Sequence, residues 1–594
     1  MIIDGSYQHS ADLLTLNSFI GLDSGTASLL SLEAFSPLNQ TEWTQHLTSY
    51  PDKKFSSYIL EGINSGFRIG FNRAQPLHSA VSNLCSNNPS IISDHLSREV
   101  SLNRMWKYPR HCSPPGIHIS PVGAIPKKNK PGKWRLIVDL SSPQGFSVND
   151  RIAPELSSLT YVSLDHLASL VTLVGRVALL VKAGIKEAYC MVPIYPDDQH
   201  LLGIQWEGSI YIDRMLPFGL RSAPKIFSAI ADTLQWILIQ QGIKHILHYL
   251  DDFILVASSQ DQAHSDRSTL ISTFHQLGVP LEPSKLEGPS VCLSFLGIEV
   301  DTEALIFRLP PNKLQRLQSE LSRCIHRRSI TKRELQSLTG LLQFATKVIR
   351  PGRPFLKQLY AMQNIGSHPE HHIRLNSTAR ADILWWHLFA ADWNGISMLW
   401  DIGKLLPEFT ILSDASGSWG CGAYWNGQWF HLQWPVYLQS LNIATKELIP
   451  VVIAAVLFGK QWQGHLVQFT VDNMAVVHVL TATYSKDPHL MHLIRILVFI
   501  AARFNFWFIA KHIEGRANTL ADDLSRNNMI HFFTQVPQAR CHSPPPIPDS
   551  LVELLGSQHL DWTSTSWIRL FGFTMNQLCP PLPTRPTKQP NAST

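Results

Sequence analysis

The sequence predicts an α+β protein built from two or three domains. The chain has 594 residues, and a single hydrophobic core stops growing near about 250–300 residues, so one core is not enough. Hydrophobic residues make up 44% of the chain, as in globular proteins. Strand and helix signals alternate up to residue 300, become helical over 311–357, and alternate again after residue 409.

The first elements are weakly signalled. Residues 1–42 are rich in Ser, Leu and Asn without a clear period, and we expect poor order there. An N-terminal extension over 43–110 follows, with a short strand or turn at 66–71. Two strand-like runs, 119–125 and 134–140, flank the turn sequence KKNKPGK. They predict a β-hairpin with a basic tip.

The middle of the chain places a carboxylate pair at a turn. Apolar residues at helical spacing predict a helix over 226–238. Two strands, 246–250 and 253–256, then flank Asp251 and Asp252, so both carboxylates would lie at a hairpin tip.

A helical segment follows Leu309-Pro310-Pro311. Thr331 and Glu334 form a capping box that opens a helix, and Pro351-Gly352 is expected to end it. Residues 360–405 predict a connection with helical pieces.

A second strand and helix region begins near Phe409. The apolar stretch 493–502 contains Arg495 and predicts a buried helix. From Pro537 onward the chain is rich in proline, and a flexible tail is expected. The predicted strands are 409–413, 419–425, 428–434, 467–471 and 504–510, and the predicted helices are 445–458, 473–481 and 519–526.

Basic residues gather in two segments. Residues 104–135 hold eight Lys and Arg and no acid, and residues 313–357 hold eleven with two Glu. Two separated basic segments suggest a polyanion held at two places, and the alternative is solvated surface.

Other features narrow the class of protein. The eight cysteines include no CxxC pair and no secreted disulfide pattern, so reduced thiols in an intracellular protein, in cytoplasm or nucleus, are expected. The first residues do not resemble a signal peptide, and no run of about 20 apolar residues predicts a membrane helix. The sequence predicts no oligomeric state.

Two motifs together resemble the core of reverse transcriptases. They are Tyr249-Leu250-Asp251-Asp252 and the LPFGLRSAP segment at 216–224, within a resemblance that runs from about 117 to 357. The resemblance implies a right-hand polymerase, with fingers and palm over 111–308, thumb over 309–360 and connection over 361–408. It also implies two Mg²⁺ or Mn²⁺ ions per active site, because nucleotide transfer uses paired divalent ions.

The same resemblance assigns residues to the polymerase site. Asp251 and Asp252 would be catalytic metal ligands, and Lys285 a proton donor to pyrophosphate. The residues implied to contact the nucleotide are Lys128, Arg135, Tyr189, Phe218 and Gly219.

One ligand of this site is missing from the sequence. The family carries a further metal-binding Asp in the first palm motif, and aligning that motif on Ile185–Tyr189 places glycine, Gly184, at its position. Glu187 lies in the wrong phase of the strand to replace it, and Asp197 and Asp198 lie in a following turn. We therefore expect impaired DNA synthesis, and Gly184→Asp as the restoring substitution.

The segment SDASGSWGCGA at 413–423 resembles the opening strand of RNase H, which cuts RNA in RNA–DNA hybrids. The resemblance implies an α/β RNase H-like domain over 409–530 with two metal ions, a mobile histidine, His512, and Asn518 orienting the last carboxylate. The implied catalytic, metal-binding carboxylates are Asp414, Glu447, Asp472 and Asp522.

The order of the domains and several short sequence motifs resemble those of DIRS-type retrotransposons, which integrate by a tyrosine recombinase. Residues 531–594 form a Pro-rich tail with a possible recombinase-start remnant. The implied function is RNA-directed DNA polymerase and RNase H of a mobile element, acting on RNA template, DNA primer, RNA–DNA hybrid and dNTPs, with no membrane. The alternatives are a catalytically silent nucleic-acid-binding relic and a telomerase or intron-maturase relative, which the fused RNase H disfavours.

Overall fold

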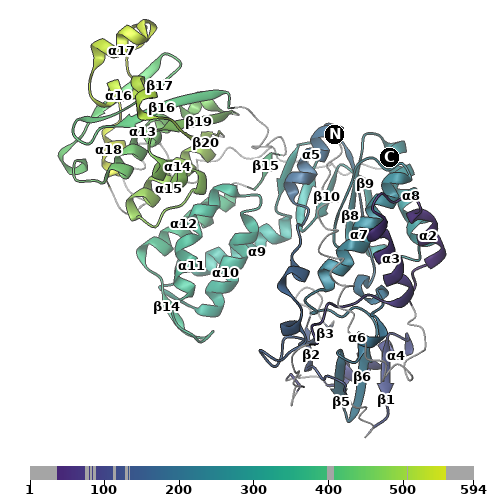
Figure 1. Cartoon of the computed structure of the whole chain (residues 1–594). Coiled ribbons are helices and arrows are strands. Elements are labelled where there is room, and N and C mark those ends of the chain that lie inside the picture. The colour runs from purple at the N-terminus through teal and green to yellow at the C-terminus, as the bar shows by residue number, and fades with distance from the viewer. Residues whose placement is uncertain are drawn as a thin grey trace, which may run out of the picture. The chain divides into compact units, whose positions relative to one another are not determined.

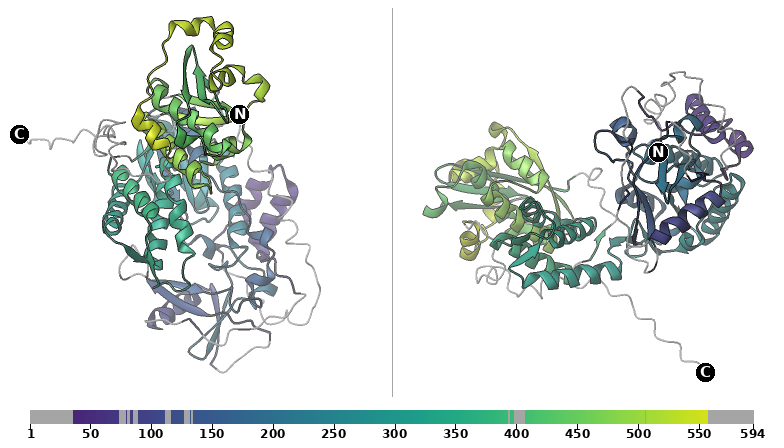
Figure 2. Two further views of the ribbon diagram at one scale, coloured as in Figure 1. Left: turned by 90° about the vertical axis from the view of Figure 1, so that its left-hand side faces the viewer. Right: turned by 90° about the horizontal axis from the view of Figure 1, so that it is seen from below.

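Two units make up the chain in the computed structural model. The first is Met1–Leu296 with Asp301–Ala304, and the second is Gly297–Val300 with Leu305–Thr594. The structure describes residues 36–73, 79, 83–84, 89–110, 116–126, 132, 134–392, 394–397, 407–463, 465–504 and 506–556. Figure 1 labels the elements, and Figure 2 shows them from two further sides.

An antiparallel sheet of order β7-β8-β4-β9 forms the centre of the first unit. Helix α8 packs on β4 and β8, α7 packs on β7, and α5 contacts β8. Because β8 is covered on both faces, its residues after Asp252 are all buried. The elements are β4 (Leu179–Gly184), β7 (Ile246–Tyr249), β8 (Asp252–Ala257), β9 (Glu287–Ser290), α5 (Leu164–Val174), α7 (Ala223–Gln240) and α8 (Gln260–Gln276).

The N-terminal helices α2 (Gln40–Leu47) and α3 (Lys53–Ser65) lie beside α7 and α8 (Figure 1, Figure 2). Trp43 is fully buried, and its indole Nε1 donates to the carbonyl oxygen of Leu277 at 2.9 Å. A buried indole N–H needs such a partner, so this contact ties α2 to the end of α8.

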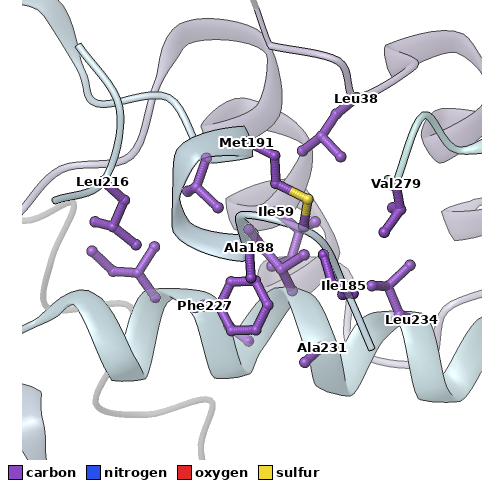
Figure 3. Close-up of a cluster of buried hydrophobic side chains, with 14 of the residues drawn as sticks. Leu38, Ile59, Ile185, Ala188, Met191, Leu216, Phe227, Ala231, Leu234 and Val279 are labelled. Atoms are coloured by element: carbon purple, nitrogen blue, oxygen red, sulfur yellow. The ribbon is translucent and has the colours of Figure 1, made fainter. Parts of the chain in front are cut away.

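A continuous core lies under the end of β4. Figure 3 shows side chains of α7, among them Phe227 and Leu234, gathered with Ile185, Ala188 and Met191 from the segment after β4. These five side chains are buried. The core therefore holds in place the backbone that follows Gly184.

The fingers of the first unit contain a sheet of order β1-β6-β5 and a separate β2–β3 hairpin. The hairpin confirms the one predicted around KKNKPGK, and Arg135 on it pairs with Ile125. The elements of the fingers are α4 (Pro89–Ser101), α6 (Pro196–Gln199), β1 (Met105–Tyr108), β2 (Val122–Pro126), β3 (Trp134–Val138), β5 (Gly203–Trp206) and β6 (Ser209–Asp213). Strand β10 (Cys292–Phe295) follows β9 and lies outside the two fingers sheets.

The second unit opens with short strands and helices. The predicted capping box is confirmed, because Thr331 Oγ1 accepts from the Glu334 amide while the Glu334 carboxylate accepts from the Thr331 amide. Helix α10 ends at Ala345, before the predicted Pro351-Gly352. The elements are β11 (Ile298–Asp301), β12 (Ile306–Arg308), β13 (Ser329–Thr331), β14 (His372–Arg374), β15 (Ile396–Ser397), α9 (Pro311–Ile325), α10 (Lys332–Ala345), α11 (Lys357–Gln363) and α12 (Ser377–Asp392).

A buried ion pair joins α12 to α15 (Pro488–Phe504) inside the second unit. Arg495 Nη2 donates to Asp382 Oδ2 at 2.8 Å, and both side chains are almost fully buried. The Trp385 ring stacks on Phe355, with centroids 4.0 Å apart. Burial raises the pKa of Asp382 to about 7 against the opposing effect of Arg495.

A five-stranded sheet of order β18-β17-β16-β19-β20 forms the rest of the second unit. Strands β18, β17 and β16 are antiparallel, whereas β19 runs parallel to β16 and to β20. This arrangement confirms the predicted fold class, in which an RNase H-like α/β domain follows a right-hand polymerase. The strands are β16 (Phe409–Ala415), β17 (Gly420–Trp425), β18 (Gln428–Gln433), β19 (Leu466–Val471) and β20 (Trp507–His512).

Helices cover both faces of this sheet. On β17, Cys421 neighbours Glu447 of α13 while a Cβ on Gly422 would meet Leu524 of α16, so these helices lie on opposite faces. The helices are α13 (Ile443–Phe458), α14 (Met474–Ala482), α16 (Thr519–Ser525), α17 (Met529–Gln535) and α18 (Asp549–Leu555).

Two predictions for this region are wrong. The strand predicted from Phe504 begins at Trp507, because Phe504 ends helix α15. The tail was expected to be flexible from Pro537, yet Leu551 and Leu555 of α18 are buried and His492 Nε2 lies 2.8 Å from the Leu554 carbonyl oxygen. Apolar burial thus orders the segment up to residue 556 despite its prolines.

Candidate active sites

The carboxylate pair of the first unit lies on a tight hairpin beside β4. Leu250 has φ +53°, which turns the chain between β7 and β8 at Asp251-Asp252. On the other side of β8, Gly184 is the register partner of Asp252. The position expected to carry the missing ligand therefore faces the pair directly.

A lysine contacts both carboxylates. Lys285 Nζ donates to Asp251 Oδ2 at 2.6 Å and to Asp252 Oδ1 at 3.0 Å. Burial alone would lower the pKa of Lys285, but the hydrogen bonds and charges of the two carboxylates outweigh it and raise that pKa. An ammonium group therefore lies where the resemblance implies metal ions, so the residues present do not fit a two-metal site.

The acids near Gly184 in sequence are engaged elsewhere. Glu187 pairs with Arg98 at 2.5 Å and with Arg104 at 2.7 Å. Asp198 is buried and pairs with Arg68 at 3.0 Å. Asp197 also lies against Arg68, at 3.4 Å. None of these three carboxylates contacts Asp251 or Asp252 among the described hydrogen bonds and ion pairs.

The structure brings Tyr189 and Phe218 together, with ring centroids 4.8 Å apart. Burial, with smaller contributions from Tyr161 and Asp251, raises the pKa of Tyr189 to about 12. Gly219 has φ +94°, which only glycine adopts easily. Lys128 lies outside the described residues, and Arg135 is exposed on the fingers hairpin.

Sequence reasoning missed Asn149, which holds the loop at 216–222. Its Nδ2 donates to the carbonyl oxygen of Gly219 at 2.9 Å and to Ser141 Oγ at 2.9 Å. Its Oδ1 accepts from the backbone amide of Arg221 at 2.7 Å. A lone Asn in SVND gives no signal of this role, because its partners lie 70 and 72 residues away.

The second unit gathers three of its predicted carboxylates. Asp414 lies on β16, Asp472 directly follows β19, and Glu447 projects from α13. Ligand oxygens of the three lie within 4.8 Å of one another. Because β16 and β19 are parallel neighbours, their ends deliver both aspartates to one place.

The electrostatics of this cluster favour a bound cation. Burial and then the neighbouring carboxylates raise the pKa of Glu447 to about 9 and that of Asp414 to about 6. Glu447 Oε2 is buried and has no hydrogen-bond partner among the described residues. Such an orphaned oxygen beside like charges fits a divalent metal ligand.

Asp522 lies at the edge of the cluster. Its charge contributes to the raised pKa of Asp414 and of Glu447, and Arg526 Nε donates to its Oδ1 at 2.6 Å. The neighbouring Asp523 is instead bound to His531 at 2.7 Å and to Gln535 at 2.8 Å, which leaves Asp522 as the residue facing the cluster.

Two further predicted residues lie nearby. His512 is exposed, with Nε2 3.1 Å from the backbone oxygen of Asp472. Asn518 was expected to orient the last carboxylate, but its Nδ2 donates to the carbonyl oxygen of Ser413 at 3.0 Å. It therefore docks the start of α16 on β16 and positions Asp522 through the backbone.

Part of the basic charge in α9 and α10 is locally neutralised. Arg323 pairs with Glu320 at 2.6 Å and Arg327 with Glu334 at 2.7 Å. Arg316 and Arg328 are exposed and make none of the described ion pairs. These two are the better candidates for phosphate contacts.

Comparison with known proteins gives a family match for the central part of the first unit. Residues 125–300 match the family model described as reverse transcriptase (RNA-dependent DNA polymerase). These residues form a reverse transcriptase domain. The match spans β3, β4, the β7–β8 hairpin and β9, so Gly184, Asp251, Asp252 and Lys285 all lie inside the reverse transcriptase domain.

Relatives of the chain include viral polyproteins. The Pro-Pol polyprotein of feline foamy virus is 24% identical over 245 residues, 41% of this chain and 19% of that protein. The Gag-Pro-Pol polyprotein of human T-cell leukemia virus 3 (strain Pyl43) is 25% identical over 280 residues, 45% of this chain and 18% of that protein. The chain thus spans about a fifth of the length of these relatives.

Solved structures similar to the chain include foamy viral protease-reverse transcriptases. One in complex with double-stranded DNA, described as dRH, is 15% identical, covers 84% of each chain and has a TM-score of 0.45. One in complex with an RNA/DNA hybrid is 14% identical, covers 81% of this chain and 64% of that chain, and has a TM-score of 0.42. Among the described residues, no helix is both long and apolar enough to cross a bilayer.

Proposed function

We propose that the chain is a retroelement reverse transcriptase with RNase H, in which cleavage of RNA in hybrids is retained and DNA synthesis is impaired. The observation that carries the proposal is the contrast between its two carboxylate clusters. Asp414, Glu447 and Asp472 converge around an unpartnered buried oxygen. Asp251 and Asp252 instead face a glycine and bind an ammonium group.

The second-unit cluster would hold divalent ions through its carboxylate oxygens. Such ions activate water and stabilise the charge that develops on phosphate during cleavage. The residues of the chain position the ligands for these ions. Asp414 and Asp472 are held by neighbouring strands, and α13 directs Glu447 between them, so the ligands are pre-positioned on rigid elements. His512, exposed beside Asp472, is placed to meet product at the rim.

The test is cleavage of a labelled RNA–DNA hybrid by the full chain with Mg²⁺ or Mn²⁺, run beside primer extension on an RNA template. Asp472→Asn should lower cleavage by about 10³-fold, because a metal loses a charged ligand while side-chain shape is kept. Glu408→Gln is the matched control, since Glu408 precedes β16 at the end of the strand away from Asp414. It should cleave like the unmodified chain.

Other results would contradict the proposal. Hybrid cleavage that survives Asp472→Asn would mean that the cluster is not the nuclease site. A folded chain that cleaves no hybrid would be the catalytically silent relic. Robust primer extension by the unmodified chain would show that Gly184 does not impair synthesis.

We further propose that the element is of the DIRS type, because the motifs HYLDDF and HIEGRANTLADDLSR resemble those of DIRS-type retrotransposons. The supporting result would be a tyrosine recombinase encoded beside this reading frame in the same element. An integrase of the retroviral class in that place would contradict it.

A further inference from the structure

The loop that carries Lys285 is fastened to Gly184 by its backbone. The amide of Glu282 donates to the carbonyl oxygen of Gly184 at 2.8 Å, and the amide of Lys285 donates to Glu282 at 2.9 Å. An isolated bridge pairs Ile185 with Leu281. Three backbone contacts therefore hold the lysine-bearing loop against β4, so that Lys285 lies next to the carboxylate pair.

The Lys285 side chain also fills the space of the missing side chain at position 184. A Cβ on Gly184 would lie 2.2 Å from Lys285 Cδ, 3.0 Å from Lys285 Cβ and 3.0 Å from Asp252 Oδ1. A contact of 2.2 Å cannot persist, so any side chain at 184 must shift the flexible lysine stem away from its present conformer. The glycine and the present lysine conformer depend on each other.

We propose that Lys285 is a built-in cation that replaces the divalent ions at Asp251 and Asp252, and that Gly184 is the residue that makes room for it. This inference rests on the proposed function, which takes the pair as the remains of a metal site. A tethered ammonium stays at high local concentration beside the carboxylates, and two carboxylates offer an incoming metal fewer anionic ligands than three.

Removing the lysine opens the pair to metal, and both residues must be changed to supply a full set of ligands. Lys285→Ala frees the pair but leaves two carboxylates. Gly184→Asp shifts the lysine stem but keeps the flexible ammonium within reach of three carboxylates, where it still competes with a metal. Only Gly184→Asp combined with Lys285→Ala offers three free carboxylates.

Metal-directed backbone cleavage tests this on the full chain. Fe²⁺ with ascorbate and hydrogen peroxide generates hydroxyl radicals at bound metal, and fragment sizes locate the cuts. The second-unit cluster is an internal reference, with cuts expected near Asp414 and Asp472 in every variant. Lys186→Ala is the matched control, because Lys186 is an exposed lysine two residues from Gly184 that makes no described contact with the pair.

The unmodified chain and Lys186→Ala should show no cuts near residues 184 and 251. The double variant should be cut there at an Fe²⁺ concentration at least about 10-fold below the concentration that either single variant needs. Equal cutting of the unmodified chain at both sites would overturn the inference. So would a folded double variant that stays uncut near residue 251.

The two proposals fail in different ways. Absence of cuts at Asp414 and Asp472 would count against the proposed nuclease site, while the pattern near residue 251 still decides the role of Lys285. If the double variant does not fold, Lys285→Ala carries the test alone. Cuts near residue 251 in Lys285→Ala, at an Fe²⁺ concentration that spares the unmodified chain, support the inference, and their absence overturns it.

Discussion

Glu447 gives the metal-free protein a pH dependence of its own. Its ordinary pKa is 4.5, and burial among carboxylates raises the pKa to about 9 in the folded state. Between these values the folded protein holds a proton that the unfolded chain has released. Raising the pH through this window must therefore lower the free energy of unfolding.

Denaturant unfolding in the presence of a chelator, from about pH 5 to about pH 9, measures this slope. Glu447→Gln carries no titrating proton, so the free energy of unfolding of the second unit should fall less steeply with pH than in the unmodified chain. Added Mg²⁺ should also flatten the slope, since a metal binds the deprotonated carboxylates. Parallel slopes for the two proteins would contradict the assignment of Glu447.

The rate of primer extension should depend on whether a variant at Gly184 or Lys285 lets the carboxylates of the palm bind metal. The unmodified chain, Gly184→Asp and Lys285→Ala should all remain poor polymerases. The combined substitution should raise synthesis above all three, because a ligand that acts in the transition state is regained at an unobstructed site, although the lysine implied as proton donor to pyrophosphate is lost. Full recovery in Gly184→Asp alone, the expectation from sequence, would show that Lys285 yields readily to metal.

At the scale of elements, Asn149 couples the short 3-10 turn at 149–151 to the loop before α7. Asn149→Ala removes three hydrogen bonds and leaves the amide of Arg221 without its partner. The free energy of unfolding of the first unit should fall by about 1–3 kcal/mol. Asn149→Asp keeps the acceptor for Arg221 and should lose less, as denaturant midpoints would show. Equal losses would mean that packing, not hydrogen bonding, explains the effect.

Elements with local signals were predictable from the sequence. The hairpin around Asp251, the capping box at Thr331 and strands β16–β19 follow from short-range patterns that the structure confirms. The boundary between α15 and β20 was not predictable, because residues 490–510 are apolar almost throughout and show no hydrophobic period that separates helix from strand. Helix α18 was not predicted, because the high proline content after Pro537 indicated a flexible tail although Leu551 and Leu555 are buried.

At the scale of the whole molecule, contacts between residues far apart in the sequence could not be predicted. Lys285 lies 101 residues after Gly184, and no local pattern shows that the loop after α8 returns to β4. The same holds for Trp43, whose partner Leu277 is 234 residues away. Motifs predicted that Asp414, Glu447 and Asp472 come together, whereas the lysine beside Asp251 and Asp252 depended on the tertiary fold.

Binding of RNA–DNA hybrid by the whole chain should weaken steeply with salt, since released counterions drive such binding. Arg328→Glu should lower affinity regardless of sequence and reduce the logarithmic salt slope by about 1. Arg323→Gln should have a smaller effect, because Glu320 and Glu334 already neutralise that arginine. Titrations at several salt concentrations compare them, and an affinity independent of salt would contradict a phosphate-binding surface.

The Asp382–Arg495 pair bears on how the chain can be divided. A fragment that begins at Phe409 retains the arginine on α15 but loses both the aspartate on α12 and the Phe355 ring under its guanidinium, and uncovering this face of α15 costs on the order of 3 kcal/mol for each large apolar side chain exposed. That is a large share of the stability of a small domain. An autonomous fragment that carries the Asp414–Glu447–Asp472 cluster must therefore start upstream of Ser377, so that α12 stays with the five-stranded sheet as one inseparable piece.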